Sequence, residues 1–314
     1  ADDATHVMSY KASIGLEGVG PTRWWGRLTP DQQPMDDHSL VYDSDPLTEP
    51  LEILGWPVAR LNVSADAIRA NWVVRISDVA PDGQVTQVAG AAFNGTHRNS
   101  AREPEDIVPN QVFPLDIELH FTSWVFPKGH RIRVAVSHAQ WPMLWPTPLP
   151  FTSTLAIGGN EGARVTLPVI PPSEETTPEF RDPVPGKGLE GYGTIESGNV
   201  TGYAAITEID RDPETGVALG VATNSGASRY PWGIERYDEL IEHRTSDENP
   251  ANTSTVGRYS LTQELEDRTL VFDQTVEFSS DEENFRLKFH RRAFVDGELL
   301  REKTWDEIIP RDFQ

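Results

Sequence analysis

The chain has 314 residues and is acidic, with 49 Asp and Glu against 27 Lys and Arg and a formal net charge of −22. Binding a nucleic-acid backbone requires a basic surface, and no run of Lys or Arg supplies one, so the composition excludes a nucleic-acid partner. The chain has no cysteine, which excludes disulfides and a thiol nucleophile. No stretch approaches the roughly 18 apolar residues that a membrane span requires, so no membrane partner is expected.

Alternating apolar and polar residues predict short strands in the first half of the chain. Residues 51–64 give one or two strands, and residues 72–76 and 84–91 flank a Pro-Asp-Gly turn at 81–83, which indicates a hairpin.

The pattern continues beyond this hairpin. Residues 113–121 form a half-buried strand, and a Pro-Lys-Gly turn at 127–129 followed by alternation over 132–136 predicts a second hairpin. With further strands at 151–157 and 164–169, about eight strands in about 140 residues are typical of a β-sandwich, and a jelly roll is the predicted topology.

The second half of the chain begins after a stretch rich in Pro, Glu and Thr at 168–185, which is typical of an interdomain linker. The Asp296-Gly297 pair predicts a hairpin between 292–295 and 298–303. These signals indicate an antiparallel meander, in which only residues 232–242 suggest a short helix. The other predicted strands of this half are 204–209, 216–221, 269–278 and 284–289.

The predicted organisation is therefore all-β and consists of two units. Residues 1–175 form a jelly-roll sandwich of the galactose-binding-like kind, in which residues 1–35 are a lead-in. Residues 176–190 form the linker, and residues 191–314 form a second, antiparallel β-rich domain.

No complete set of catalytic residues is recognisable. A serine hydrolase carries its nucleophile in a Gly-x-Ser-x-Gly turn, with a His base and an acid to orient it. The segment Gly226-Ala227-Ser228 begins such a pentapeptide, but position 230 is Tyr. We therefore expect no catalytic residue, and read this segment as a turn between strands.

Metal ligands are not indicated either, and we expect no metal and no cofactor. The histidines at 120, 130 and 138 lack the spacing of a metal site and are expected to be surface residues. Three acidic groups lack the 12-residue pattern of a calcium loop and are expected to be solvated. They are Asp36-Asp37, Asp43 with Asp45, and residues 281–283.

The most informative segment is residues 141–150, which holds two Trp, a Met, two Leu and four Pro. Its prolines prevent a helix or a ladder, so it must be a rigid loop, and so apolar a loop should be covered by another surface. It could cap the core of the sandwich, dock against a partner domain, or wall a ligand pocket. The same three roles are open for Trp24-Trp25 and Trp124. The residues assigned to domain docking or a pocket wall are Trp124, Trp141, Met143, Leu144 and Trp145.

Ordered motifs lie between residues 36 and 170. They are SLVYDS (39–44), LEILG (51–55), VSADA (63–67), RISDVAPDG (75–83) and FPKGHRIRVAVS (126–137), followed by Trp141-Pro142. Together they resemble the C-terminal domain of CocE/NonD-type hydrolases, relatives of the X-Pro dipeptidyl-peptidases. The tail KTWDEIIPRDFQ (303–314) is similar to an extension found in one branch of that family.

This resemblance implies a jelly-roll fold that packs beside an α/β-hydrolase domain, which holds the Ser, Asp and His of an acyl-enzyme mechanism for ester or amide cleavage. No position here matches those catalytic residues. We therefore expect the non-catalytic C-terminal portion of such a serine hydrolase, with the α/β-hydrolase domain or chain as its partner. Its role would be to buttress that domain and shape its substrate pocket.

Two other functions stay open. A jelly roll can be a free-standing carbohydrate-binding module whose Trp rings stack on sugars. Alternatively, the second β domain could mediate homo-oligomerisation in a structural protein. The start Ala1-Asp2-Asp3 has neither an initiator Met nor a signal peptide, so we expect a processed chain or a piece of a longer one, with a cytoplasmic location favoured over a secreted one.

Overall fold

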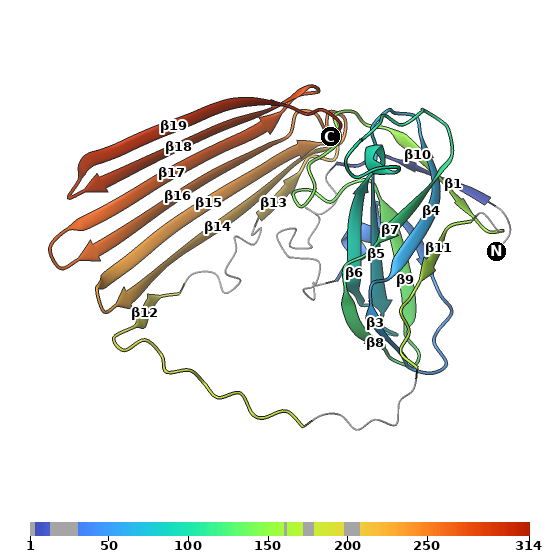
Figure 1. The fold of residues 1–314 in the computed structure, drawn as a ribbon, viewed down its shortest axis with the longest axis horizontal. Coiled ribbons are helices and arrows are strands. Elements are labelled where there is room, and N and C mark those ends of the chain that lie inside the picture. Colours follow the sequence, from blue (N-terminus) through green and yellow to red (C-terminus); the bar gives the residue numbers. More distant parts are fainter. Residues whose placement is uncertain (1–3, 13–30, 160–161, 172–178, 198–207) are drawn as a thin grey trace.

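The computed structural model of the chain describes residues 4–12, 31–159, 162–171, 179–197 and 208–314 (Figure 1). It is built almost wholly of antiparallel strands, with one helical turn, α1 (Gln33–Asp36), and one 3-10 turn at Gly95–His97. The predicted all-β class is confirmed, while the jelly-roll topology stays a prediction. Trp24-Trp25, most of the lead-in, linker residues 176–178 and residues 204–207 of a predicted strand lie outside the described residues.

The first unit consists of two main sheets and a strand pair. One sheet has the order β1-β10-β4-β11, with β7 also paired to β4, and the other has the order β2-β9-β5-β6. The first contains β1 (Ala4–Ser9), β4 (Val58–Ala65), β7 (Phe113–Glu118), β10 (Thr152–Ile157) and β11 (Arg164–Thr166). The second contains β2 (Leu40–Asp43), β5 (Asn71–Val79), β6 (Val85–Asn94) and β9 (Arg131–Ser137). The pair is β3 (Leu51–Gly55) with β8 (Thr122–Phe126).

The main core of the molecule lies within this unit. Strands β4 and β5 are buried along most of their length, and Leu61, Trp72, Ile76 and Phe126 are among the fully buried side chains of one continuous cluster. Strand β5 is buried at every position, so both of its faces are covered, whereas β7 alternates between buried and exposed positions as expected for a sandwich strand with one face in water.

The predicted turns have different outcomes. The hairpin around residues 81–83 is confirmed, because β5 pairs with β6. The hairpin around residues 127–129 is wrong, because β8 pairs with β3 whereas β9 pairs with β2 and β5. The Pro-Lys-Gly turn carries the chain from one sheet to another, and alternation indicates a strand without specifying its partner.

The second unit is a broad sheet of long strands, which extends away from one end of the sandwich as a single layer (Figure 1). Its order is β12-β14-β15-β16-β17-β18-β19, with β13 also paired to β14, and the predicted meander is confirmed. The strands are β12 (Gly193–Glu196), β13 (Glu208–Arg211), β14 (Val217–Tyr230), β15 (Gly233–Ser246), β16 (Ser254–Leu265), β17 (Thr269–Ser280), β18 (Asn284–Val295) and β19 (Glu298–Pro310).

Three predictions within this sheet can be compared with the structure. The β18–β19 hairpin is confirmed, and its turn residues Asp296 and Gly297 both have positive φ, at 51° and 84°. The turn expected at 226–228 is wrong, because these residues lie within β14. The short helix at 232–242 is also wrong. Residues 233–242 lie in β15, which pairs along its length with β14 and β16, and that pairing on both sides overrides the local apolar spacing.

Candidate functional site

The segment 141–150, here called the tryptophan loop, connects β9 to β10 at the end of the sandwich next to the C-terminal sheet. The Trp141 side chain is 1% exposed and packs with Ala218 of β14. Its ring meets His243 of β15 edge-on, at a centroid separation of 5.7 Å. The loop is thus covered by the chain's own C-terminal sheet.

Trp145 adds a second set of contacts with the same sheet. Its ring lies edge-on to Phe278 of β17 at 4.6 Å and to Phe285 of β18 at 5.8 Å, and to Trp141 at 4.7 Å. Its indole Nε1 donates a hydrogen bond of 2.8 Å to Ser280 Oγ. A Trp with both an apolar body and a satisfied N–H is well suited to fix one element against another.

The other predicted site residues lie in different surroundings. Met143 and Leu144 lie between the two tryptophans and remain part-exposed. Trp124 is on β8 and packs against the main core, and its Nε1 donates to Asp78 Oδ2 at 3.1 Å. The other oxygen of Asp78 lies 2.8 Å from His130 Nδ1. The structure therefore brings Trp141 and Trp145 together and places Trp124 in a separate polar cluster.

The end of the chain forms a second connection between the units, which the sequence did not reveal. Arg311 is 1% exposed, and its guanidinium donates to the carbonyls of Pro146, in the tryptophan loop, and Asp281, at 3.1 Å for the latter. It also lies over the Phe285 ring at 4.9 Å. Burial lowers the pKa of Arg311 to about 10, so the group remains charged at neutral pH. Its only sequence signal is a position directly after Pro310, which ends the last strand.

Two further contacts extend this joint. The Phe313 carbonyl accepts hydrogen bonds from Asn94 Nδ2 at 2.9 Å and Thr96 Oγ1 at 3.3 Å, both in the sandwich. At the β15–β16 connection, Asp247 accepts the Ala12 N–H at 2.9 Å and pairs with Lys11 at 3.4 Å. His38 of the sandwich also lies 3.3 Å from Arg211 of β13, so backbone and side chains from several places in the sandwich hold the sheet.

Burial at the joint also changes the protonation of a histidine. Burial lowers the pKa of His243 to about 4, so the imidazole that faces Trp141 is neutral at pH 7. Its Nδ1 lies 3.0 Å from Thr255 Oγ1. The joint therefore combines neutral aromatic contacts around Trp141 and Trp145 with a buried charge, Arg311, and an ion-pair group in which Asp247 contacts Lys11 and Arg211.

A serine–histidine contact does occur in the sandwich, where His138 Nε2 lies 2.6 Å from Ser153 Oγ. Both side chains are buried, so the prediction that His138 lies at the surface is wrong, and burial lowers the pKa of His138 to about 3. A nucleophile needs access to substrate and a base that can take up a proton near neutral pH, and this pair offers neither.

One carboxylate in each of the three acidic groups considered for calcium is engaged by arginine, and the prediction of a solvated group is wrong for Asp36, which is buried. Asp36 contacts Arg75 at 2.8 Å and Arg133 at 3.1 Å, and Asp43 contacts Arg133 at 2.7 Å. Asp281 contacts Arg286 at 2.8 Å. Among the described residues, no group of three or more His, Cys, Asp or Glu is arranged to hold a metal ion.

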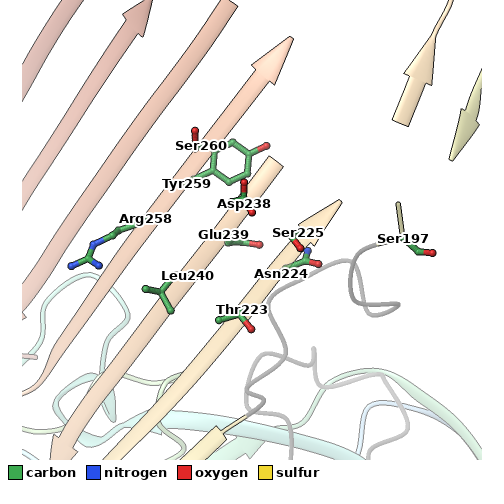
Figure 2. A pocket seen from close by; sticks show the side chains of 10 residues that line it. All are labelled: Ser197, Thr223, Asn224, Ser225, Asp238, Glu239, Leu240, Arg258, Tyr259 and Ser260. Carbon is green, nitrogen blue, oxygen red and sulfur yellow. The ribbon is translucent and has the colours of Figure 1, made fainter. Parts of the chain in front are cut away.

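A hollow of about 480 Å³ lies on the C-terminal sheet (Figure 2). Its walls carry hydroxyl, carboxylate and guanidinium groups, including Thr223, Asp238, Arg258 and Ser260. Ser260 Oγ donates to Asp273 at 2.9 Å and is thus held within the sheet. None of the predicted site residues lines this hollow.

The family of the chain follows from comparison with known proteins. The model of the X-Pro dipeptidyl-peptidase C-terminal non-catalytic domain matches residues 2–163, just over half of the sequence. The chain belongs to this family. The matched residues of the X-Pro dipeptidyl-peptidase C-terminal domain coincide with the sandwich, and the resemblance drawn from the ordered motifs is confirmed.

Among curated proteins, the cocaine esterase of Rhodococcus sp. (strain MB1 Bresler) is 33% identical over 114 residues, which is 36% of this chain and 20% of that protein. The chain thus matches about a fifth of this relative's length. The helices in the described part of the chain are not long and apolar enough to cross a membrane.

Two solved structures are similar to this member of the family, each at 23% identity and a TM-score of 0.48. One is an α-amino acid ester hydrolase, covering 53% of this chain and 32% of its own. The other is an aminopeptidase from the marine sediment archaeon Thaumarchaeota archaeon, covering 55% of this chain and 34% of its own. At this TM-score the likenesses carry no further conclusion.

Proposed function

We propose that this chain acts as the non-catalytic C-terminal portion of a CocE/NonD-type serine hydrolase. In this role it buttresses an α/β-hydrolase catalytic domain and shapes the pocket for the acyl or leaving group of an ester or amide. The observation that carries the proposal is the match of residues 2–163 to the non-catalytic domain of X-Pro dipeptidyl-peptidases.

The chemistry of the chain supports a non-catalytic role. The sequence has no Gly-x-Ser-x-Gly motif, and the Ser153–His138 contact is buried with an imidazole that does not protonate near neutral pH. The curated relative named as an esterase is about five times longer than its matched part. A catalytic domain in addition to this chain would supply the nucleophile and its base.

The proposal divides the chain into residues 1–175, a linker at 176–190, and residues 191–314. Trp141 and Trp145 fix the C-terminal sheet against the sandwich, because their rings contact β15, β17 and β18. Met143 and Leu144, which are part-exposed, together with Trp124, are the residues assigned to the catalytic domain or its pocket wall. The partner is a cytoplasmic α/β-hydrolase domain, rather than nucleic acid or membrane.

The first test is the activity of the chain alone. We expect the purified chain to leave p-nitrophenyl acetate unhydrolysed and to take up no fluorophosphonate label, because the sequence has no Gly-x-Ser-x-Gly motif and the Ser153–His138 contact is buried. Hydrolysis that a serine-directed fluorophosphonate abolishes would overturn the proposal.

The second test is reconstitution with the α/β-hydrolase polypeptide encoded with this chain, in the same or a neighbouring reading frame. We expect the chain to bind this polypeptide and to raise its ester hydrolysis, and we expect no hydrolysis when its nucleophilic Ser is replaced by Ala. Absence of any encoded Gly-x-Ser-x-Gly polypeptide, or of any binding to it, would contradict the proposal.

The carbohydrate-binding alternative is not favoured. A sugar platform needs exposed, coplanar aromatic rings, whereas Trp141 is buried and meets Trp145 at an interplanar angle of 89°.

A further inference from the structure

The C-terminal sheet is amphipathic. Directly paired residues in an antiparallel sheet project to the same face, and the register is continuous from β14 to β18 and along most of β19. One row across the sheet carries Glu242, Val256, Glu277, Lys288 and Asp306 on the charged face. The opposite face, here called the apolar face, carries two rows with large apolar residues, one with Ile241, Val276, Phe289 and Trp305 and one with Leu261 and Phe272. A polar row of Glu239, Gln274, Arg291 and Lys303 lies between them.

Within the described part of the chain, the sandwich covers one end of the apolar face. His243, Phe278 and Phe285, which the tryptophan loop contacts, project to this face. The next row along the strands contains Ile241, Val276, Phe289 and Trp305, and these side chains remain part-exposed. The covered interface thus continues directly into an uncovered apolar surface.

The sheet lacks a core of its own. Among the described residues of its strands, the buried apolar side chains are Ala218, Ala222 and Ala227, and the large apolar residues of the face stay partly accessible to water. The Phe289 and Trp305 rings stack at 5.2 Å, and so present a continuous aromatic surface. A sheet with one apolar face normally buries that face against a second layer, and large exposed apolar patches mark interaction sites.

Basic side chains flank this aromatic surface on the same face. Lys303 Nζ lies 4.3 Å from the centroid of the Trp305 ring, and Arg291 is directly paired with Lys303 across β18 and β19. Both are exposed, and among the described residues neither forms an ion pair with a carboxylate. On a chain of net charge −22, this local basic pair is complementary to a surface that carries carboxylates.

We propose that the apolar face is a docking surface for the α/β-hydrolase catalytic domain, and this inference rests on the proposed function. The matched part of the cocaine esterase is 20% of its length, so a large polypeptide without counterpart in this chain is available to form the second layer. The domain would place an apolar ridge on Val276, Phe289 and Trp305, and carboxylates opposite Arg291 and Lys303. The interface would then be continuous with the one that the tryptophan loop already forms.

The test compares two adjacent positions on β18. Phe289→Glu places a charge on the apolar face, and Lys288→Glu places the same side chain on the opposite, charged face of the same strand. Calorimetric titration of each full chain with the α/β-hydrolase polypeptide encoded with it measures the dissociation constant. We expect Phe289→Glu to weaken binding by at least about tenfold, as for a buried aromatic anchor, and Lys288→Glu to change it by less than about twofold.

Circular dichroism establishes that each variant is folded. If Phe289→Glu fails to fold, Trp305→Ala replaces it, and hydroxyl-radical footprinting of the wild-type chain should show Trp305 protected in the complex. If the wild-type chain binds, the apolar-face variant (Phe289→Glu or its replacement Trp305→Ala) binds equally well, and Trp305 is unprotected in the complex, then the docking surface is wrong and the proposed function still holds. If the chain alone sediments as a dimer that Phe289→Glu dissociates, the occupant is a second copy and the inference is wrong. Failure of the wild-type chain to bind contradicts both proposals.

Discussion

Replacing Trp141 by Ala tests how the two units are joined. Complete burial of a Trp side chain removes about 150–250 Å² from water, and at about 25 cal/mol per Å² this contributes about 4–6 kcal/mol. The Trp141 Nε1 is buried without a hydrogen-bond partner among the described residues, which offsets about 1–3 kcal/mol of that gain. We therefore expect Trp141→Ala to destabilise the joint by about 3 kcal/mol.

The loss should fall on the joint rather than on the main core. Trp141 clusters with Ala218 and Trp145, whereas the large core cluster lies within the sandwich. We expect small-angle scattering to report a larger radius of gyration for the variant, and urea unfolding to show a separate, earlier transition for the C-terminal sheet. Trp141→Phe retains the ring contact and removes the unpaired N–H, so its loss should be below about 1.5 kcal/mol.

Trp56 offers a matched control, because it is 57% exposed and its ring contacts Phe121. Trp56→Ala should cost less than about 1 kcal/mol and leave the scattering curve unchanged. If Trp141→Ala shifts the unfolding free energy no more than this control does, and the radius of gyration stays constant, then Trp141 does not hold the joint and the reasoning is refuted.

Three other predictions concern the charged and titratable groups of the joint. The pKa of His243 is about 4 in the folded chain and near 6.5 in the unfolded chain. The unfolded chain therefore takes up a proton first, and the free energy of unfolding decreases as the pH falls from about 6.5 to about 4. Between pH 7 and pH 5 the wild type should lose about 2 kcal/mol more than His243→Asn in urea titrations, and equal pH dependence would contradict this. Arg311→Met removes charged hydrogen bonds to two carbonyls and should lower the free energy of unfolding by about 3 kcal/mol, with an unchanged urea midpoint as the contrary result. Asp247→Asn weakens ion pairs with Lys11 and Arg211, so it should cost about 1 kcal/mol at low salt and less at 1 M NaCl, and a salt-independent effect would argue against an electrostatic role.

Local chemistry explains which parts of the fold could be predicted. The Pro-Asp-Gly and Asp-Gly turns specify their backbone conformation within a few residues, and both hairpins that they indicated are present. Strand pairing is not local, and so nothing in residues 126–137 indicated that β8 and β9 would join different sheets. The segment now assigned to β15 looked helical because its apolar spacing was read without its two neighbours.

The candidate site was predictable only in part, for the same reason. The composition of the tryptophan loop showed that it needed a cover, because exposed Trp and Leu side chains are unfavourable in water. The cover comes from Phe278 and Ser280, more than 130 residues away in the sequence, and no local pattern links them to Trp145. Arg311 was missed because a single Arg near a chain end usually lies on the surface.

The attachment of the C-terminal sheet at both of its ends has a consequence for chain connectivity. At its start the sheet follows the linker, and at its end Phe313 is hydrogen-bonded to Asn94 and Thr96 of the sandwich. Contacts at the tryptophan loop, at Asp247 and at the tail hold the sheet against the sandwich in addition to the linker. We expect the two units to stay associated after a cut within residues 179–190, because these contacts join residues that lie far apart in the sequence.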